Sequence, residues 1–234
     1  MRRQDAEIPA PGGLCHGTLH IPGGAGPWPG LLVFPDAGGV RETFRQLADR
    51  LAGLGYVVLV PDIYYRAGAW EPFDVATLFT DDRERARMAG LAGQLTNVRI
   101  IADSGAYAGF LLDRPEVRGP AIGTTGYCLG GRMSLLAAGG IGPRIAAAAS
   151  FHGGRLAVAG DPSSPHLLAG QITATVYVAG ATDDSHFTAE QAELLHSALA
   201  AAGTDHTVET YAAKHGFAVP DNPTYDPAAE ARHW

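Results

Sequence analysis

Short apolar runs alternate with helical patterns along most of the chain. The continuous apolar runs are bounded by glycine, proline or polar residues, which is typical of strands buried on both faces of a parallel sheet. They lie at residues 30–34, 56–60, 121–127, 144–150, 173–179 and 206–211, and a further short strand is expected at 15–21. Helices are expected at 44–54, 97–112, 129–138, 188–202 and 226–234. This order predicts an α/β fold, a mostly parallel central sheet flanked by helices and built with right-handed crossovers.

The segment from residue 63 to residue 93 breaks this alternation. It is irregular and carries Tyr64, Trp70, Phe73 and Phe79 among small and charged residues. Such a segment can form a cap over a pocket at the end of the sheet, or its aromatic side chains can simply pack down onto the body. Both interpretations remain open. With no linker or repeat elsewhere, we expect residues 1–234 to form a single domain with a cap-like segment at about 63–93.

Composition narrows the class of protein. The chain has 234 residues, a formal net charge of −7, 46% hydrophobic residues and 18% charged residues. The negative charge argues against nucleic acid or an anionic membrane as the partner. Neither a secretion signal nor a membrane-spanning run is evident, and two cysteines are too few for a disulfide framework. We therefore expect a cytoplasmic protein with a small-molecule substrate, as a monomer or a homodimer.

The stretch 121–138 carries the strongest chemical signal. It passes through Gly126-Tyr127-Cys128-Leu129-Gly130 between a predicted strand and a predicted helix. The pattern G-x-C-x-G is the nucleophile elbow of α/β-hydrolases with cysteine in place of serine. The flanking glycines remove side chains that would collide across the turn, and a helix N-terminus favours both a thiolate and an oxyanion.

Two other interpretations of this stretch are weaker. An inert buried cysteine would not need glycines on both sides. A dinucleotide-binding loop would need a different glycine spacing, which Arg132 interrupts, and an acidic residue after the next apolar run.

A base and an acid for this thiol are found at later strand ends. His215 follows the last predicted strand, and Asp183 follows the one before it, so Cys128, Asp183 and His215 occur in the α/β-hydrolase order. The histidine would take the proton of the thiol, and the aspartate would orient the imidazole. Asp184 competes for the acid position, but the G-x-x-D spacing favours Asp183.

Other histidines offer neither a better base nor a metal site. His152, His186 and His206 are rivals of the predicted base, but none of them lies in a turn just past the last strand. His16 and His20 have no evident third ligand, so we expect no metal, and we expect no other cofactor.

The chain resembles the dienelactone hydrolase family, a cysteine-dependent branch of the α/β-hydrolase superfamily. The matching motifs are PDIY at 61–64, GYCLGG at 126–131, GATD at 180–183 and HGFA at 215–218, and the likeness extends over residues 15–220. The resemblance implies an α/β-hydrolase fold and a triad of Cys128, Asp183 and His215. It also implies an oxyanion hole formed by the backbone N–H groups of Leu129 and Ala37.

The resemblance also implies residues that control the nucleophile and the substrate. Asp36 matches an acidic family residue that contacts the resting nucleophile, although glutamate is usual there. Arg85, or else Arg83, matches an arginine that holds a substrate carboxylate, whereas Val219 stands where the family has a second one. We expect the substrate cavity to lie between Tyr64, Trp70, Arg85 and Cys128.

The sequence therefore predicts a hydrolase of small esters or lactones that acts through a Cys-His-Asp triad and a thioester acyl-enzyme. The alternative is a non-catalytic binding or thiol redox-sensing module on a hydrolase fold.

Overall fold

One sheet of eight strands forms the centre of the molecule. The computed structural model describes residues 1–78 and 80–234. The strand order is β1-β2-β4-β3-β5-β6-β7-β8. The pairings β1–β2 and β2–β4 are antiparallel, and the pairings from β4 to β8 are all parallel. The strands are β1 (Arg2–Ala10), β2 (Gly13–Ile21), β3 (Trp28–Phe34), β4 (Val57–Pro61), β5 (Val117–Tyr127), β6 (Ile145–Phe151), β7 (Thr175–Asp183) and β8 (His206–Lys214).

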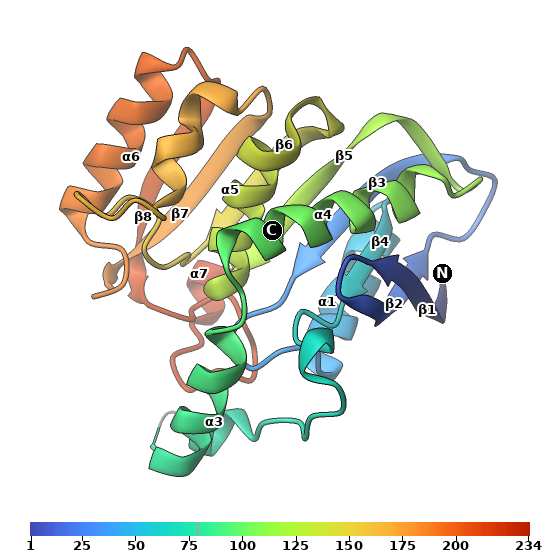
Figure 1. The fold of residues 1–234 in the computed structure, drawn as a ribbon, viewed down its shortest axis with the longest axis horizontal. Coiled ribbons are helices and arrows are strands. Elements are labelled where there is room, and N and C mark those ends of the chain that lie inside the picture. The colour runs from blue at the N-terminus through green and yellow to red at the C-terminus, as the bar shows by residue number, and fades with distance from the viewer. Residues whose placement is uncertain (79) are drawn as a thin grey trace.

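Helices cover both faces of this sheet, as the parallel crossovers require. Figure 1 views the molecule from the side of α4, α5 and α6, with the sheet behind them. The helices are α1 (Glu42–Gly53), α2 (Val75–Leu78), α3 (Asp82–Ala92), α4 (Asn97–Leu112), α5 (Leu129–Ile141), α6 (Ala189–Ala201) and α7 (Pro227–His233), with 3₁₀ turns η1 (Tyr65–Ala67), η2 (Gly142–Arg144) and η3 (Pro165–Gln171). The α/β fold predicted from the apolar pattern is confirmed.

Two apolar clusters hold the layers together, one on each face of the sheet. The larger joins the sheet to α4, α5 and α6 through side chains such as Tyr107, Leu136 and Leu199. The smaller joins it to α1 and α7 and includes Phe44 and Val58. The central strands are therefore apolar on both sides, which explains their continuous apolar runs. Among the described residues, no helix is long and apolar enough to cross a membrane.

The first strand was not expected from the sequence. β1 pairs with β2 along its whole length at the edge of the sheet, and only Ala6 and Ile8 in it are buried. An edge strand with one buried stripe can carry charged residues at its other positions, so it lacks the apolar run by which the central strands were recognised.

The cap-like segment combines the two interpretations left open by its sequence. Phe73, Val75 and Leu78 are buried against the body, whereas α3 has no buried residue. Figure 1 shows α3 projecting below the rest of the molecule. Phe79, the remaining aromatic residue of the segment, lies outside the described residues.

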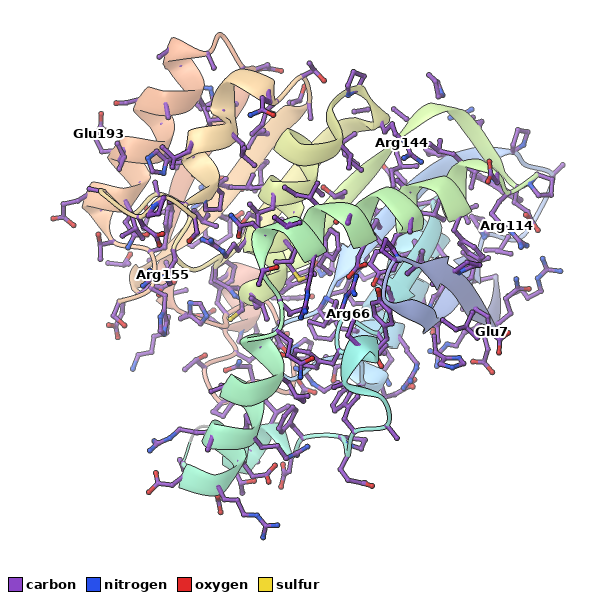
Figure 2. All side chains as sticks on the ribbon, viewed as in Figure 1. Glu7, Arg66, Arg114, Arg144, Arg155 and Glu193 are labelled. Carbon is purple, nitrogen blue, oxygen red and sulfur yellow. The ribbon has the colours of Figure 1, made fainter. Side chains whose placement is uncertain are left out.

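The start of this segment is tied to the body by an ion pair. The Arg66 guanidinium donates to Asp103 of α4, with Nη2 2.6 Å from Oδ1. Figure 2 shows Arg66 in the space between α4 and the first hairpin. The irregular segment is therefore anchored to the body of the molecule near its start.

Candidate active site

The turn from β5 into α5 is built around Cys128. This residue has a positive φ of 55°, and α5 begins at the next residue. A Cβ on Gly126 would lie 1.9 Å from the carbonyl oxygen of Gly130, and a Cβ on Gly130 would lie 2.2 Å from that of Phe34. Only glycine fits at either position. The local backbone therefore requires the G-x-C-x-G pattern and places the thiol at the apex of a strained turn.

His215 joins the thiol to a buried carboxylate. Its Nε2 lies 3.0 Å from Cys128 Sγ, and its Nδ1 lies 2.7 Å from Asp184 Oδ2. The Asp184 side chain is fully buried, and Cys128 is half-buried. The order of contacts, thiol to imidazole to carboxylate, is that of a nucleophile, a base and a residue that orients the base.

The carboxylate that contacts His215 belongs to Asp184, one residue after the predicted Asp183. Asp183 is the last residue of β7, its side chain is 76% exposed, and its carboxylate lies 3.8 Å from Lys214 Nζ. β7 runs four residues beyond the predicted end at Ala179, to Asp183, which pairs with Lys214 of β8. Because successive side chains of a strand point to opposite sides, Asp184 faces the site and Asp183 faces solvent.

The electrostatics of the site favour a charged imidazole. Burial by itself lowers the pKa of His215, but the hydrogen bonds to Asp184 and Cys128 and the charges of both groups outweigh it and raise that pKa to about 10. An imidazolium beside a sulfur stabilises a thiolate. The arrangement therefore places a charged imidazole beside the sulfur at neutral pH.

Two further histidines pack against the base. The rings of His152 and His186 lie edge-on to His215, with centroids 5.3 Å and 5.0 Å away. His152 is fully buried, and within the described part of the chain neither of its ring nitrogens has a hydrogen-bond partner. Complete burial lowers the pKa of His152 well below its usual range, and the charge of His215 lowers it further. Both rings therefore act as packing for His215 here.

The two predicted oxyanion donors lie on segments that the fold fixes firmly. Leu129 is the first residue of α5, directly after the nucleophile, where backbone N–H groups have no partner within the helix. Ala37 follows β3, and its carbonyl oxygen accepts a hydrogen bond of 2.8 Å from the hydroxyl of Tyr64. That bond fixes the orientation of the Ala37 backbone. Tyr64 thus has a structural contact that its predicted substrate role did not include.

Asp36 is bound to a cation and not to the nucleophile. Its Oδ1 accepts from Arg41 Nη1 at 2.7 Å, and its Oδ2 accepts from Arg41 Nη2 at 2.9 Å. Oδ1 also accepts from the backbone N–H of Gly38 at 2.9 Å. The carboxylate therefore faces Arg41 while the sulfur faces His215, so the predicted gating role has no direct contact behind it in this structure.

The other predicted substrate contacts are divided between two places. Trp70 packs edge-on against Tyr64, and its indole N–H donates to Asp62 at 3.0 Å. Arg85 lies on α3, where it pairs with Asp82 one turn earlier, and about half of its side chain is exposed. Tyr64 and Trp70 therefore lie together beside the loop after β3, which contains Ala37, whereas Arg85 belongs to the projecting helix.

A cavity of about 390 Å³ opens beside His215. It is lined by three segments: residues 76 and 80 of the cap-like segment, residues 183–186 after β7, and residues 215 and 222–224 after β8. The cap-like segment therefore contributes to a cavity at the candidate base. Within the described residues, no cluster of three or more potential metal ligands is present.

Sequence reasoning passed over residues whose role depends on distant contacts. Arg41 precedes α1, and a cation at a helix N-terminus is unfavourable unless other groups neutralise it. That anomaly was a signal for a carboxylate partner. Thr224, whose hydroxyl donates to the backbone oxygen of His215, gave no signal in the sequence.

The sheet order, the elbow and the thiol–imidazole–carboxylate contacts define a protein of the α/β-hydrolase fold. The model of the dienelactone hydrolase family matches residues 15–234. The chain therefore belongs to the dienelactone hydrolase family, and it is a hydrolase of that class.

Named relatives and solved structures agree with this assignment. The carboxymethylenebutenolidase of Pseudomonas sp. is 27% identical, over 98% of this chain and 90% of that protein. A solved dienelactone hydrolase-like promiscuous phosphotriesterase from metagenomic libraries is 29% identical, covers 100% of this chain and 95% of its own, and superposes with a TM-score of 0.78. A solved structure titled m3DLH is 28% identical with a TM-score of 0.81, over 100% of this chain and 94% of its own.

Proposed function

We propose that this protein cleaves small carboxylic esters or lactones with Cys128 as nucleophile, His215 as general base and acid, and Asp184 as the residue that orients His215. The observation that carries the proposal is the 3.0 Å contact between Cys128 Sγ and His215 Nε2 at the elbow. The name of the Pseudomonas relative supports lactone cleavage as one form of this chemistry.

The first half of the reaction forms a thioester. The Cys128 thiolate attacks the carbonyl carbon, and the electron pair of the C=O bond moves to the oxygen. The backbone N–H groups of Leu129 and Ala37 stabilise that oxyanion. When the C=O bond reforms, the bond to the leaving oxygen breaks, and His215 gives its proton to the departing alkoxide. In a lactone the alcohol stays attached to the acyl group.

The second half returns the enzyme to its starting state. His215, now neutral, takes a proton from a water molecule, whose oxygen attacks the thioester carbonyl. The bond from carbon to Sγ then breaks, which releases the acid and restores the thiolate beside the imidazolium. Asp184 holds the proton-bearing Nδ1 of His215 throughout, which keeps Nε2 facing the sulfur.

The charges around the cavity support an uncharged substrate. Among the described residues that line it, Asp183 and Asp184 are the acidic ones, and no lysine or arginine is present. Val219, which stands where the family has a second arginine, is fully buried. Arg41 is neutralised by Asp36 and Asp221. Within the described lining, His215 is the cationic group and Asp184 neutralises it, so a carboxylate on the substrate would find no unpaired cation there.

The test compares the two cysteines. Cys128→Ala is expected to lower kcat/KM for p-nitrophenyl acetate on the order of 10³-fold or more, because the nucleophile is gone. Cys15→Ala is the control, since Cys15 is buried in the core, and it should retain activity within about twofold. The same assay should show no preference for a hemisuccinate ester over a neutral ester.

Two results would count against the proposal. Undiminished turnover by Cys128→Ala would remove Cys128 as nucleophile. Rapid alkylation of Cys128 by iodoacetamide, with no turnover across an ester and lactone panel, would favour a thiol-sensing module.

A further inference from the structure

Arg41 lies between the two loops that carry the candidate oxyanion donor and the candidate base. Its side chain is only 11% exposed. Besides its two bonds to Asp36, it binds Asp221 through Nε to Oδ2 at 2.7 Å and through Nη2 to Oδ1 at 2.8 Å. We call Asp36, Arg41 and Asp221 the Arg41 bridge. Two bidentate pairs on one guanidinium fix its position and orientation on both sides.

One end of the Arg41 bridge holds the loop after β3, which contains Ala37. Asp36 directly precedes Ala37 and is 6% exposed. Its carboxylate binds the N–H of Gly38, and its backbone oxygen accepts from the N–H of Gly39 at 2.9 Å. Ala37 thus lies inside a turn whose shape depends on the Asp36 side chain. Arg41 keeps that side chain in place.

The other end holds the loop that follows His215. Besides its two bonds from Arg41, Asp221 accepts a hydrogen bond of 2.5 Å from the hydroxyl of Thr43 on α1. The next residue, Asn222, binds the backbone N–H of Thr224 at 3.1 Å, and the Thr224 hydroxyl donates to the backbone oxygen of His215. The Arg41 bridge therefore connects the two loops at the N-terminus of α1.

We propose that Arg41 is a positioning residue that sets the direction of the Ala37 N–H toward the developing oxyanion; this inference rests on the proposed function. Without Arg41, the Asp36 carboxylate would be buried and unpaired, so its loop would open to hydrate it. His215 keeps its own contacts with Asp184 and Cys128, which do not pass through Arg41. Loss of Arg41 should therefore damage oxyanion stabilisation more than thiol reactivity.

The experiment measures ester turnover and thiol alkylation on the same variants. Arg41→Met should lower kcat for p-nitrophenyl acetate by about 10²-fold, the usual effect of losing one oxyanion donor, and leave KM within about threefold. The rate of Cys128 alkylation by iodoacetamide, and its pH profile, should stay within about twofold, because alkylation needs the thiolate but no oxyanion hole.

Arg50→Met is the matched control. Arg50 lies at the opposite end of α1 and also joins the C-terminal segment, through Glu230 at 3.0 Å. The Arg50→Met substitution removes the same charge but leaves the contacts of Asp36 intact, so kcat should stay within about twofold. Arg41→Lys keeps the charge without the two-sided fork, so it should fold with kcat still lowered about tenfold, which gives a result even if Arg41→Met does not fold.

The outcomes separate the two proposals. A kcat of Arg41→Met or Arg41→Lys equal to that of Arg50→Met would overturn the positioning role. An equal loss of turnover and alkylation in Arg41→Lys would also overturn it, because the damage would then lie at the Cys128–His215 pair. Absence of turnover in the wild-type protein, or its persistence in Cys128→Ala, would instead reject the proposed function.

Discussion

Two adjacent aspartates at the end of β7 have opposite surroundings. Asp184 is buried, with one oxygen on His215 and the other on the backbone N–H of His186 at 2.8 Å. Asp183 faces solvent near Lys214. The two residues have the same side chain and are neighbours in the chain. Their different surroundings therefore come from the side of the sheet to which each one points.

This difference predicts a sharp contrast between two conservative variants. Asp184→Asn should lower kcat/KM by about 10³ to 10⁴-fold, because an amide no longer favours the His215 tautomer with its proton on Nδ1. Asp183→Asn should stay within about twofold. Steady-state kinetics on a neutral nitrophenyl ester would measure both. Equal losses in the two variants would show that the carboxylate acts through the general field of the site.

At the scale of elements, the elbow depends on close contact between β3, β5 and α5. Gly130, in the first turn of α5, lies against the end of β3, where a Cβ would come within 2.2 Å of the Phe34 oxygen and 2.5 Å of the Pro35 oxygen. Both atoms are backbone and cannot move aside cheaply. The same approach brings the loop after β3, which carries the proposed oxyanion donor, next to Cys128, so the packing and the proposed chemistry share one requirement.

Gly130→Ala is therefore expected to destabilise the fold by more than about 3 kcal/mol, or to prevent folding. Gly90→Ala is its counterpart in a helix, because a Cβ there meets nothing within 4 Å. That variant should gain up to about 1 kcal/mol from helix propensity. Urea unfolding monitored by circular dichroism would compare them. A Gly130→Ala protein as stable as the wild type would contradict the close approach of the two elements.

At the scale of the whole molecule, α7 completes the second face of the sheet with a half-buried histidine. His233 Nε2 lies 2.9 Å from the Tyr127 hydroxyl, and its ring stands edge-on to Phe151 at 4.0 Å. Burial lowers the pKa of His233 to about 4, and the charge of Arg50 adds to the effect. The native protein therefore holds this ring neutral at pH values at which an unfolded chain would protonate it.

Linkage then gives a pH dependence of stability. The unfolded histidine has a pKa near 6.5, so the His233 contribution is complete above pH 6.5 and is lost as the pH falls toward 4, by about 3 kcal/mol for a shift of about 2.5 units. His233→Gln, which can still accept from Tyr127, should lose that much less unfolding free energy over this range. His16→Gln, at an exposed position, should follow the wild type. Parallel curves for all three proteins would contradict the account.

The sequence predicted those parts of the molecule that are determined locally. The parallel strands have continuous apolar runs because both faces are covered, and Gly126 of the elbow is required by its contact with Gly130, a few residues later. The end of β7 could not be predicted, because it depends on pairing between Asp183 and Lys214, which come from distant parts of the chain. β1 was missed because an edge strand needs only a few apolar residues.

In the candidate site, too, the residues that local motifs determine were predicted and the others were not. Cys128 and His215 follow from motif and order, and the structure brings them together. Asp184 required the side of the strand to be known. The cation at the start of α1 pointed to a carboxylate partner, but the pairing of Arg41 with Asp221 joins residues 180 positions apart, so neither spacing nor composition could reveal it.

The account depends most on one covalent bond, between Cys128 Sγ and the acyl carbon of the substrate. Acid-quenched samples taken within the first turnovers of p-nitrophenyl acetate, analysed by intact-protein and peptide mass spectrometry, would detect it. We predict one acetyl group on the peptide that contains Cys128, released by hydroxylamine and absent from Cys128→Ala. Ester turnover with no adduct on that peptide, or with an adduct on another residue, would contradict the account.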